Sequence, residues 1–372
     1  MKKILKGILK LVLPKKVRDI IRKMIRPEHQ RYLPPMWRRR TEKYTERALK
    51  CAVICDELTY ANLKSSVDVV FLSPNNWRTK LKRERPDLFF CEAAWEGLGG
   101  EWSDKIYRNR QYEEDNRSAL MAILKYCQRA GVPTVFWNKE DTPEFAEATY
   151  NFIDTALLFD HIFTTCAECI PQYEARGHNS VHLMMFGYSP ELFSETEQRP
   201  GNGVAVFLGS WYEANRERCE DMRQLFDAVL EQGLELRIYD RVSEKNWSDR
   251  QYPERYRPYI LPAVPYEQTG EMMNGADYVL NINSVKDSET MFARRVFEAV
   301  ACGRIVISND SVGMEKIFPG GIWFVDQPFD RENEAEIIRR NKETVQKYTF
   351  YAQLEQAMCK IGIENIKKVE GK

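Results

Sequence analysis

The chain has 372 residues, of which 43% are hydrophobic, and its formal net charge is zero. This length predicts two or three domains, and this composition is enough for ordinary globular cores. The charge is uneven, because residues 1–50 carry 17 Lys or Arg and 4 Asp or Glu, a net of +13, which leaves a net of −13 on the rest. A basic arm on an acidic body indicates contact with a membrane or a nucleic acid at one end.

Residues 1–26 are predicted to form a basic amphipathic segment that lies on an anionic membrane surface. They are not a signal peptide, because their apolar residues are dispersed among charges and no run approaches the ~20 residues that span a bilayer. Drawn as helices on either side of Pro14, the apolar residues form one arc, and seven of the ten basic residues lie opposite: Lys3, Lys6, Lys10, Lys16, Arg22, Lys23 and Arg26. The alternative is a helix packed on the protein's own core. Residues 27–47 are predicted to be a linker.

The cysteines and acidic residues are informative about metals and redox state. The nine cysteines are an odd number, with no secretory signal before them, so a reducing compartment is expected. Cys166 and Cys169 have the spacing of a zinc or redox pair, but no two further ligands at matching spacing are nearby. No Asp-x-Asp pair occurs in the sequence, which disfavours transferases that hold a divalent metal on a nucleotide diphosphate. No metal and no cofactor are therefore expected.

From residue 48 onward, strands and helices alternate, which predicts a parallel α/β sheet. In the first half, strands are expected at 51–55, 67–72, 88–91, 132–137, 161–165 and 181–185, and helices at 113–130, 145–159 and 167–176. A polar stretch at 189–202, rich in proline and glycine, predicts a domain boundary. The alternation then restarts, with strands at 204–208, 234–239, 259–264, 278–282, 304–308 and 322–325, and helices at 215–232, 266–274, 333–347 and 350–368.

Residues 278–303 are the part of the second half that is richest in candidate chemistry. A mostly apolar run at 278–282 predicts a buried strand, and Asn283 begins a polar loop. The following helix is expected to carry Phe292 on its apolar face and to end at Gly303.

Arg294, Arg295 and Glu298 are expected on the side of this helix away from its apolar stripe. The open N-terminus of such a helix attracts phosphate, and two arginines add cationic donors for a diphosphate. A carboxylate two turns into the helix can accept hydrogen bonds from a pair of sugar hydroxyls. The alternative is a solvated helix face with an Arg294–Glu298 ion pair.

Two other loops of the second half are also candidates for ligand binding. Gly209 and Ser210 follow the strand at 204–208, and the next helix begins with Arg216 and Arg218. A glycine allows close backbone approach to a ligand, and arginines suit phosphate. The loop at 262–267 is expected to meet a flat base through its backbone.

The second half resembles the C-terminal domain of GT-B glycosyltransferases on three motifs: FLGSWYEANRER, PAVPYEQTGEMMNGADYVLNI and ARRVFEAVACGRIVISND. The likeness is to the large family-4-like group, and more closely to its CgeB-like spore-maturation branch. The first half, with LFFCEAAWEGLGGEW and VFWNKEDTPEF, resembles the acceptor-side domain of that branch. The resemblance implies an α/β chain with two Rossmann-like parallel-sheet domains that face a cleft. It also implies a nucleotide-diphosphate-sugar donor, bound mainly by the second domain without metal.

The resemblance also implies roles for single residues. Family-4-like enzymes carry two glutamates eight positions apart, and the later one, which contacts the donor ribose, matches Glu298. The earlier one falls at Thr290, so the pattern is broken, and the adjacent Glu289 remains open as a replacement. The glycine that presents its backbone N–H to the diphosphate falls at Ala293. Arg295 is the expected diphosphate ligand, and retention or inversion is left open. The donor-binding candidates are Gly209, Ser210, Arg216, Val264, Tyr266, Asn283, Ala293, Arg294, Arg295 and Glu298.

Polar and aromatic residues follow the strand ends of the first half, where the acceptor is expected. Carboxylates there can act as a general base or bind sugar hydroxyls, and indoles stack on sugar faces. The alternative is that these residues cap helices and fill loops. The catalytic candidates are Glu96, Asp141 and Glu298, and the acceptor-binding candidates are Glu92, Trp95, Asn138 and Glu140.

The sequence as a whole predicts a cytoplasmic glycosyltransferase, peripheral on the inner face of the membrane. Its partners would be a nucleotide sugar and a cell-surface glycan, polymer or lipid-linked acceptor, with no nucleic acid. The predicted parts are the membrane segment and linker at 1–47, an acceptor domain at 48–195, a nucleotide-sugar domain at 196–345 and a C-terminal helix at 346–372. One rival transfers polyol phosphate in wall-polymer synthesis, and another is a non-catalytic glycan- or nucleotide-binding module.

Overall fold

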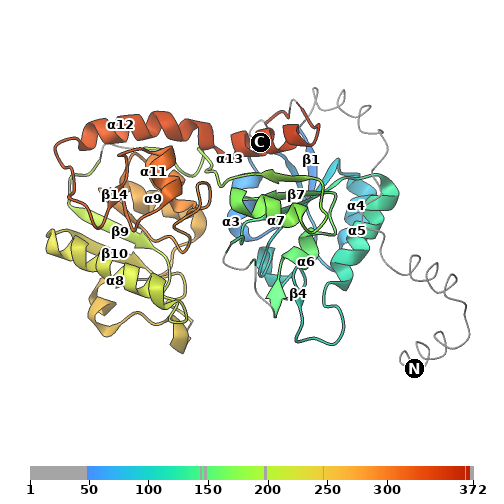
Figure 1. The fold of residues 1–372 in the computed structure, drawn as a ribbon, viewed down its shortest axis with the longest axis horizontal. Helices are drawn as coiled ribbons and strands as arrows, with labels where there is room; N and C mark the ends of the chain where they lie inside the picture. Colours follow the sequence, from blue (N-terminus) through green and yellow to red (C-terminus); the bar gives the residue numbers. More distant parts are fainter. Residues whose placement is uncertain are drawn as a thin grey trace, which may run out of the picture. The chain divides into compact units, whose positions relative to one another are not determined.

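The first half of the chain forms a sheet of six parallel strands in the order β2-β1-β3-β5-β7-β8. The strands at 88–92 and 134–138 are buried at every residue, and those at 50–54 and 161–164 at all but the first, as expected for a parallel sheet that is covered on both faces. The strands are β1 Lys50–Ile54, β2 Asp68–Phe71, β3 Leu88–Glu92, β5 Thr134–Asn138, β7 His161–Thr164 and β8 Val181–Leu183. The connecting helices are α3 Glu57–Leu63, α4 Trp77–Glu84, α5 Ser118–Ala130, α6 Ile153–Ala156 and α7 Ile170–Glu174. Helices α4 and α5 lie side by side (Figure 1), with the rings of Trp77 and Tyr126 in edge-to-face contact.

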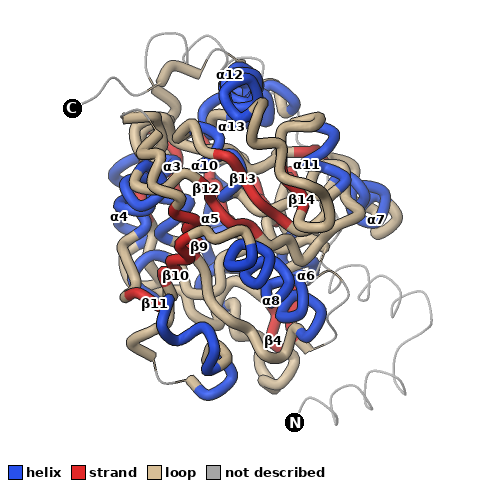
Figure 2. The backbone as a smooth tube through the Cα atoms, turned by 90° about the vertical axis from the view of Figure 1, so that its left-hand side faces the viewer, coloured by secondary structure: helices blue, strands red, loops and turns tan. Residues whose placement is uncertain are grey.

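The second half forms another sheet of six parallel strands, in the order β11-β10-β9-β12-β13-β14, which follow one another across Figure 2. The strands are β9 Val204–Leu208, β10 Glu235–Tyr239, β11 Ile260–Leu261, β12 Tyr278–Asn281, β13 Ile305–Ser308 and β14 Trp323–Phe324. The helices are α8 Arg216–Glu231, α9 Thr269–Asn274, α10 Arg295–Ala301, α11 Val312–Ile317 and α12 Glu334–Val345. The α/β class with two parallel sheets is therefore confirmed.

The computed structural model describes residues 48–142, 145, 149–196, 199–245, 247–364 and 366–368. The predicted membrane segment at 1–26 and the linker at 27–47 lie outside the described residues. Within the described ranges, no helix is both long enough and apolar enough to cross a membrane.

Each sheet has one place where the order of its strands reverses along the chain. In the first sheet the chain goes from β1 to β2 on one side and then returns to β3 on the other side of β1. In the second sheet, β9 has β10 on one side and β12 on the other. Open α/β sheets bind ligands beyond the carboxyl ends of the strands at such a switch point. Ligand-binding residues are therefore expected after β1 and β3 in the first sheet, and after β9 and β12 in the second.

The C-terminal helix α13, Phe350–Lys360, lies against β8 and α3 of the first half. The chain returns there beside the segment that leaves the first sheet. Tyr188 donates its backbone N–H to the carbonyl oxygen of Tyr348 and accepts from the N–H of Phe350. The two connections between the halves are thus hydrogen-bonded to each other, and residues 346–360 do not stand apart from the two sheets.

Several predicted helices differ from the observed ones. The helix expected at 145–159 is replaced, in its described part, by the short strand β6, Tyr150–Asn151, and by α6. Strand β6 pairs antiparallel with β4, Arg108–Asn109, and this pairing between distant segments overrides the local helical pattern. The helix expected at 350–368 ends at Lys360, before Gly362, whose φ is +78°. The 3-10 turns are η3 Leu98–Gly100, η4 Ala167–Cys169, η5 Ser248–Arg250, η6 Glu254–Tyr259, η7 Tyr266–Gln268 and η8 Gln346–Tyr348.

Replacing Gly187 by alanine is expected to destabilise the fold, because the two connections touch at this glycine. A Cβ there would lie 2.7 Å from the backbone nitrogen of Phe350 and 2.8 Å from its Cα. Overpacking of this kind costs about 1–3 kcal/mol. Gly275→Ala is the matched control, since the nearest atom to its Cβ would be 3.5 Å away. Denaturation by urea should show a lower midpoint for Gly187→Ala alone; equal midpoints would contradict the close approach.

Candidate functional site

Acidic residues and one lysine meet at the switch point of the first sheet. Asp56 follows β1, Glu92 ends β3, and Lys139 follows β5. The Lys139 ammonium lies 2.9 Å from Asp56 Oδ2 and also pairs with Glu92. Burial raises the pKa of Glu92 to about 7, although Lys139 acts in the opposite direction. Glu92 was predicted on the acceptor side, whereas the importance of Lys139 was not foreseen, because a single lysine after a strand has no spacing pattern.

Trp95, an acceptor-binding candidate, is held among aromatic rings. Its ring centroid lies 5.0 Å from those of Tyr107 and Phe152, in edge-to-face arrangements that favour a fixed orientation. Burial raises the pKa of Glu140 above its usual value. The charge of Lys139 and a hydrogen bond from Trp95 offset only part of this rise. Glu96, by contrast, is exposed. Trp95 and Glu140 are therefore joined in one group with Lys139, and Glu96 lies at the surface.

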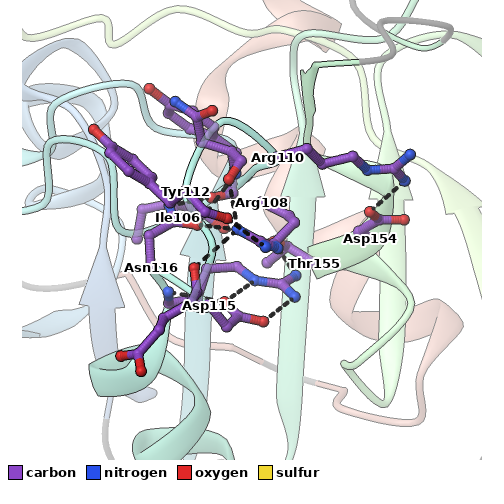
Figure 3. A network of polar contacts seen from close by, with 12 residues as sticks. Ile106, Arg108, Arg110, Tyr112, Asp115, Asn116, Asp154 and Thr155 are labelled. Atoms are coloured by element: carbon purple, nitrogen blue, oxygen red, sulfur yellow. Dashed lines mark hydrogen bonds and ion pairs between the residues drawn. The ribbon is translucent and has the colours of Figure 1, made fainter. Parts of the chain in front are cut away.

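The loop that follows this aromatic group is tied down by polar contacts (Figure 3). The Arg108 guanidinium donates to the carbonyl oxygen of Tyr112 and to the Asn116 side chain, both at 3.1 Å. Arg110 pairs with Asp154 at 2.9 Å. A segment without long secondary structure is thus held in one conformation beside the acceptor-side residues.

Asn138 and Asp141 lie inside the domain. Asp141 accepts hydrogen bonds from Asn138 Nδ2 and Thr164 Oγ1, both at 2.6 Å, and from the Tyr173 hydroxyl at 3.0 Å. Burial raises its pKa to about 7. With both oxygens engaged, the residue is placed to fix the end of β5 against β7, and this geometry corresponds to the alternative interpretation of a loop-filling carboxylate.

At the switch point of the second sheet, the chain passes close to the side chain of Arg295. The Arg295 guanidinium donates to the carbonyl oxygen of Leu208 at the end of β9. A Cβ on Gly209 would lie 2.8 Å from the Phe207 ring and 3.3 Å from Arg295 Nη2. The hydroxyl of Ser210 is buried and has no hydrogen-bond partner in the described part of the chain. A glycine and an unpartnered buried hydroxyl therefore adjoin a buried cation.

Three arginines influence one another at this place: Arg218 on α8, Arg241 after β10 and Arg295 on α10. Burial, together with the charges of Arg241 and Arg218, lowers the pKa of Arg295 to about 9. Over the residues that the structure describes, none of the three forms an ion pair with a carboxylate. An unneutralised cluster of guanidinium groups is suited to a multiply charged anion. Arg216, in contrast, is exposed and lines a surface hollow of about 840 Å³ with Trp211 and Arg223.

Glu298 is only 3% exposed, so the alternative interpretation of a solvated helix face is wrong. Helix α10 begins at Arg295, so Phe292 lies in the preceding loop and the face calculated for a longer helix does not apply. Glu298 Oε1 accepts from Arg294 Nε at 2.5 Å and from the Tyr266 hydroxyl at 2.7 Å. The Arg294–Glu298 pair of the alternative interpretation is present, but it is buried.

Asn283 and Ala293 are hydrogen-bonded to each other, so the Ala293 N–H is already engaged within the protein. The Ala293 N–H donates to Asn283 Oδ1 at 3.0 Å, and the Asn283 N–H donates to Asn309 Oδ1 at 2.9 Å. Asn283 is buried, and Val264 is half-buried between β11 and η7. The structure thus places Asn283 as a support for the loop before α10, and the roles of all three in ligand binding stay predictions.

Thr290, at the position of the missing glutamate, links the two halves of the chain. Its hydroxyl donates to the carbonyl oxygen of Thr165 at 3.0 Å and accepts from the N–H of Ala167 at 2.9 Å. Next to it, the Glu168 carboxylate accepts from the N–H of Glu289 at 2.9 Å. The Glu289 side chain is itself exposed and paired with Lys316. The loop before α10 therefore docks on the segment that follows β7.

All nine cysteines are free thiols. Cys166 lies in this docked region, with its Sγ 3.7 Å from Ser288 Oγ. A hydrogen bond from Cys169 lowers the pKa of Cys166 to about 7. No group of three or more His, Cys, Asp or Glu side chains in the described ranges is arranged to hold a metal ion.

Residues 216–362 match the model of a protein family described as glycosyl transferase-like. The structure is similar to that of Anabaena HepE in complex with UDP and glucose, with a TM-score of 0.51 and 12% identity over 86% of this chain and 93% of that one. A glycosyltransferase from Rickettsia africae has a TM-score of 0.45 and 10% identity, over 84% of this chain and 99% of that one. The lipopolysaccharide outer core galactosyltransferase WaaB has a TM-score of 0.42 and 11% identity, over 84% and 99%. No curated protein sequence matches the chain.

The fold is thus that of the GT-B glycosyltransferases, and the second half carries a glycosyl transferase-like domain. These two findings define the class of the protein, which is a glycosyltransferase.

Proposed function

We propose that the protein transfers a sugar from a nucleoside-diphosphate sugar to a glycan, polymer or lipid-linked acceptor of the cell envelope, without a metal ion. The observation that supports this best is the cluster of Arg218, Arg241 and Arg295 beside Gly209, for which the described part of the chain supplies no ion-pair partner. Three guanidinium groups can neutralise a diphosphate in place of a divalent cation. The similar structure from Anabaena was obtained with UDP and glucose, which favours a donor of the same chemical type.

Glu298 is proposed to bind the donor ribose. Its Oε1 is engaged by Arg294 and Tyr266, and Oε2 is then the oxygen that accepts from ribose hydroxyls. Arg294, held over the Tyr266 ring at 4.9 Å, forms an ion pair with the carboxylate. The loop with Val264 is proposed to contact the base through its backbone.

Glu92 is proposed to be the general base that takes the proton from the acceptor hydroxyl. It lies at the switch point of the first sheet, and its negative charge, after Tyr266 and Glu298, is among those that raise the pKa of Arg294 against the effect of burial. Its pKa of about 7 suits proton transfer at neutral pH. Trp95 and Glu140 are proposed to hold the acceptor sugar by stacking and hydrogen bonding.

The resemblance to the CgeB-like branch and the basic segment at 1–26 support a location in the cytoplasm, on the inner face of the membrane. A membrane-bound enzyme meets a lipid-linked or growing polymer acceptor where that acceptor is made. This part of the proposal rests on the sequence alone.

A nucleoside diphosphate should bind in the presence of EDTA as tightly as with magnesium, because arginines supply the positive charge. Arg295→Ala should weaken binding by roughly 10- to 100-fold, since hydrogen bonds to charged groups contribute about 1.5–3 kcal/mol. Arg216→Ala, at an exposed position, should stay within about twofold of wild type. Calorimetry with UDP, GDP, ADP, CDP and TDP measures all three. Binding that disappears with the chelator would overturn the metal-independent site.

Glu92→Gln should abolish most turnover while leaving nucleotide affinity close to wild type, because the amide cannot accept the proton. General base catalysis contributes about 10²–10⁴-fold. The wild-type rate should rise with pH through about 7, the pKa of Glu92, since only the ionised carboxylate is a base. Glu96→Gln is the matched control and should retain its rate. Equal losses in both variants, or a rate that falls as the pH rises through 7, would argue against this role.

Residues 1–26 should hold the enzyme on anionic vesicles, and raising the salt should weaken this binding without abolishing it. Each basic residue near an anionic leaflet contributes about 1 kcal/mol, which salt screens, whereas the apolar arc adds a term that salt does not screen. Deleting 1–26 should release the protein in a vesicle sedimentation assay while nucleotide binding survives. A full-length protein that ignores anionic vesicles at low salt would refute the membrane proposal.

A further inference from the structure

A chain of hydrogen bonds runs from the first half of the protein to the carboxylate of Glu298. Asn62, on α3, donates from Nδ2 to the hydroxyl of Tyr266 at 2.8 Å. The same hydroxyl donates to Glu298 Oε1 at 2.7 Å. One hydroxyl therefore uses its single proton for Glu298 and a lone pair for Asn62, and each bond constrains the other.

Asn62 and Tyr266 are each held in place by further contacts. Asn62 is 1% exposed, and its Nδ2 also donates to the carbonyl oxygen of Leu58 at 2.7 Å. The Tyr266 ring contacts the Phe193 ring, with 5.5 Å between the centroids, and the Arg294 guanidinium lies 4.9 Å from the Tyr266 centroid. A ring with these neighbours has few rotamers available, so the direction of its hydroxyl is determined by Asn62 and Glu298.

We propose that Tyr266 is a positioning residue that couples the donor site at Glu298 to the acceptor-side half of the protein through Asn62. The inference rests on the proposed function, because it takes Glu298 as the ribose-binding carboxylate. With Tyr266 and Arg294 on Oε1, Oε2 is oriented for the ribose hydroxyls. A shift of α3 would move Asn62, and the loss of its hydrogen bond would leave the Tyr266 hydroxyl free to rotate away from Glu298.

Such coupling is reciprocal. If the position of α3 alters donor affinity, then donor binding stabilises that position of α3 by the same free energy. Helix α13 belongs to the segment that returns from the second half of the chain. It contacts α3, so α3 touches the second half's return segment as well as Tyr266. Donor binding would thus favour the arrangement of the acceptor-side half in which Asn62 reaches Tyr266.

The test measures the Kd of the best-bound nucleoside diphosphate from UDP, GDP, ADP, CDP and TDP. Tyr266→Phe should weaken binding about tenfold, since one hydrogen bond to a charged group is lost. Asn62→Ala should weaken it about threefold, although the Asn62 side chain donates to Leu58 and Tyr266 and not to Glu298. The double variant should bind like Tyr266→Phe alone, because both substitutions break the same chain. Lys64→Ala, at the residue that follows this helix, is the matched control; the Lys64 ammonium is exposed and lies 3.9 Å from the Glu267 carboxylate, and its loss should leave the Kd unchanged.

The outcomes distinguish this inference from a purely structural role and from the proposed function. An Asn62→Ala protein with a lower melting temperature but wild-type Kd would show that Asn62 only supports the fold, and would overturn the coupling. Losses that add in the double variant would mean two independent effects, and would overturn it as well. A wild-type protein that binds none of the five nucleotides would refute the proposed function and the inference with it.

Discussion

The buried carboxylate of Glu298 is the interaction on which the second half of the site depends. A charge removed from water is stable only where an opposite charge and hydrogen bonds replace its hydration. Arg294 supplies the charge and Tyr266 the hydrogen bond, so the start of α10 and the turn η7 are held at one point. Because Tyr266 is also bonded to Asn62, the same compensation extends to the first half of the chain.

The loop before α10 explains how a site of this class can lack the first of the two family glutamates. A threonine at that position binds two backbone groups of the other half, the carbonyl oxygen of Thr165 and the N–H of Ala167. A glutamate could accept from the N–H but could not donate to the carbonyl oxygen unless it were protonated. Thr290 therefore exchanges a possible contact with the donor for a contact between the two halves, and Arg295 remains as the main cation beside Gly209.

Most strands could be predicted from the sequence, because buried parallel strands are short apolar runs bounded by turns. The helices at 145–159 and around Phe292 could not, since the β4–β6 pairing and the docking of Thr290 are contacts between distant segments. Candidate site residues could be named from the sequence where a motif carried them, as at Gly209, Arg295 and Glu298. Lys139 and Arg241 had no motif, and their importance depends on which strand ends adjoin. The burial of Glu298 was missed because α10 is shorter than its apolar pattern indicates.

The two switch points differ in whether their cations have carboxylate partners, and this difference supports the proposed roles. Beside β9, three arginines have no carboxylate partner among the described residues, which preserves their charge for an anionic ligand. Beside β1 and β3, one lysine is shared between Asp56 and Glu92. A lysine paired with Glu92 alone would lower the pKa of that carboxyl further and make it a weaker base. Because Lys139 is shared and Glu92 is buried, the pKa remains near 7, where a carboxylate can take a proton from a hydroxyl and release it again.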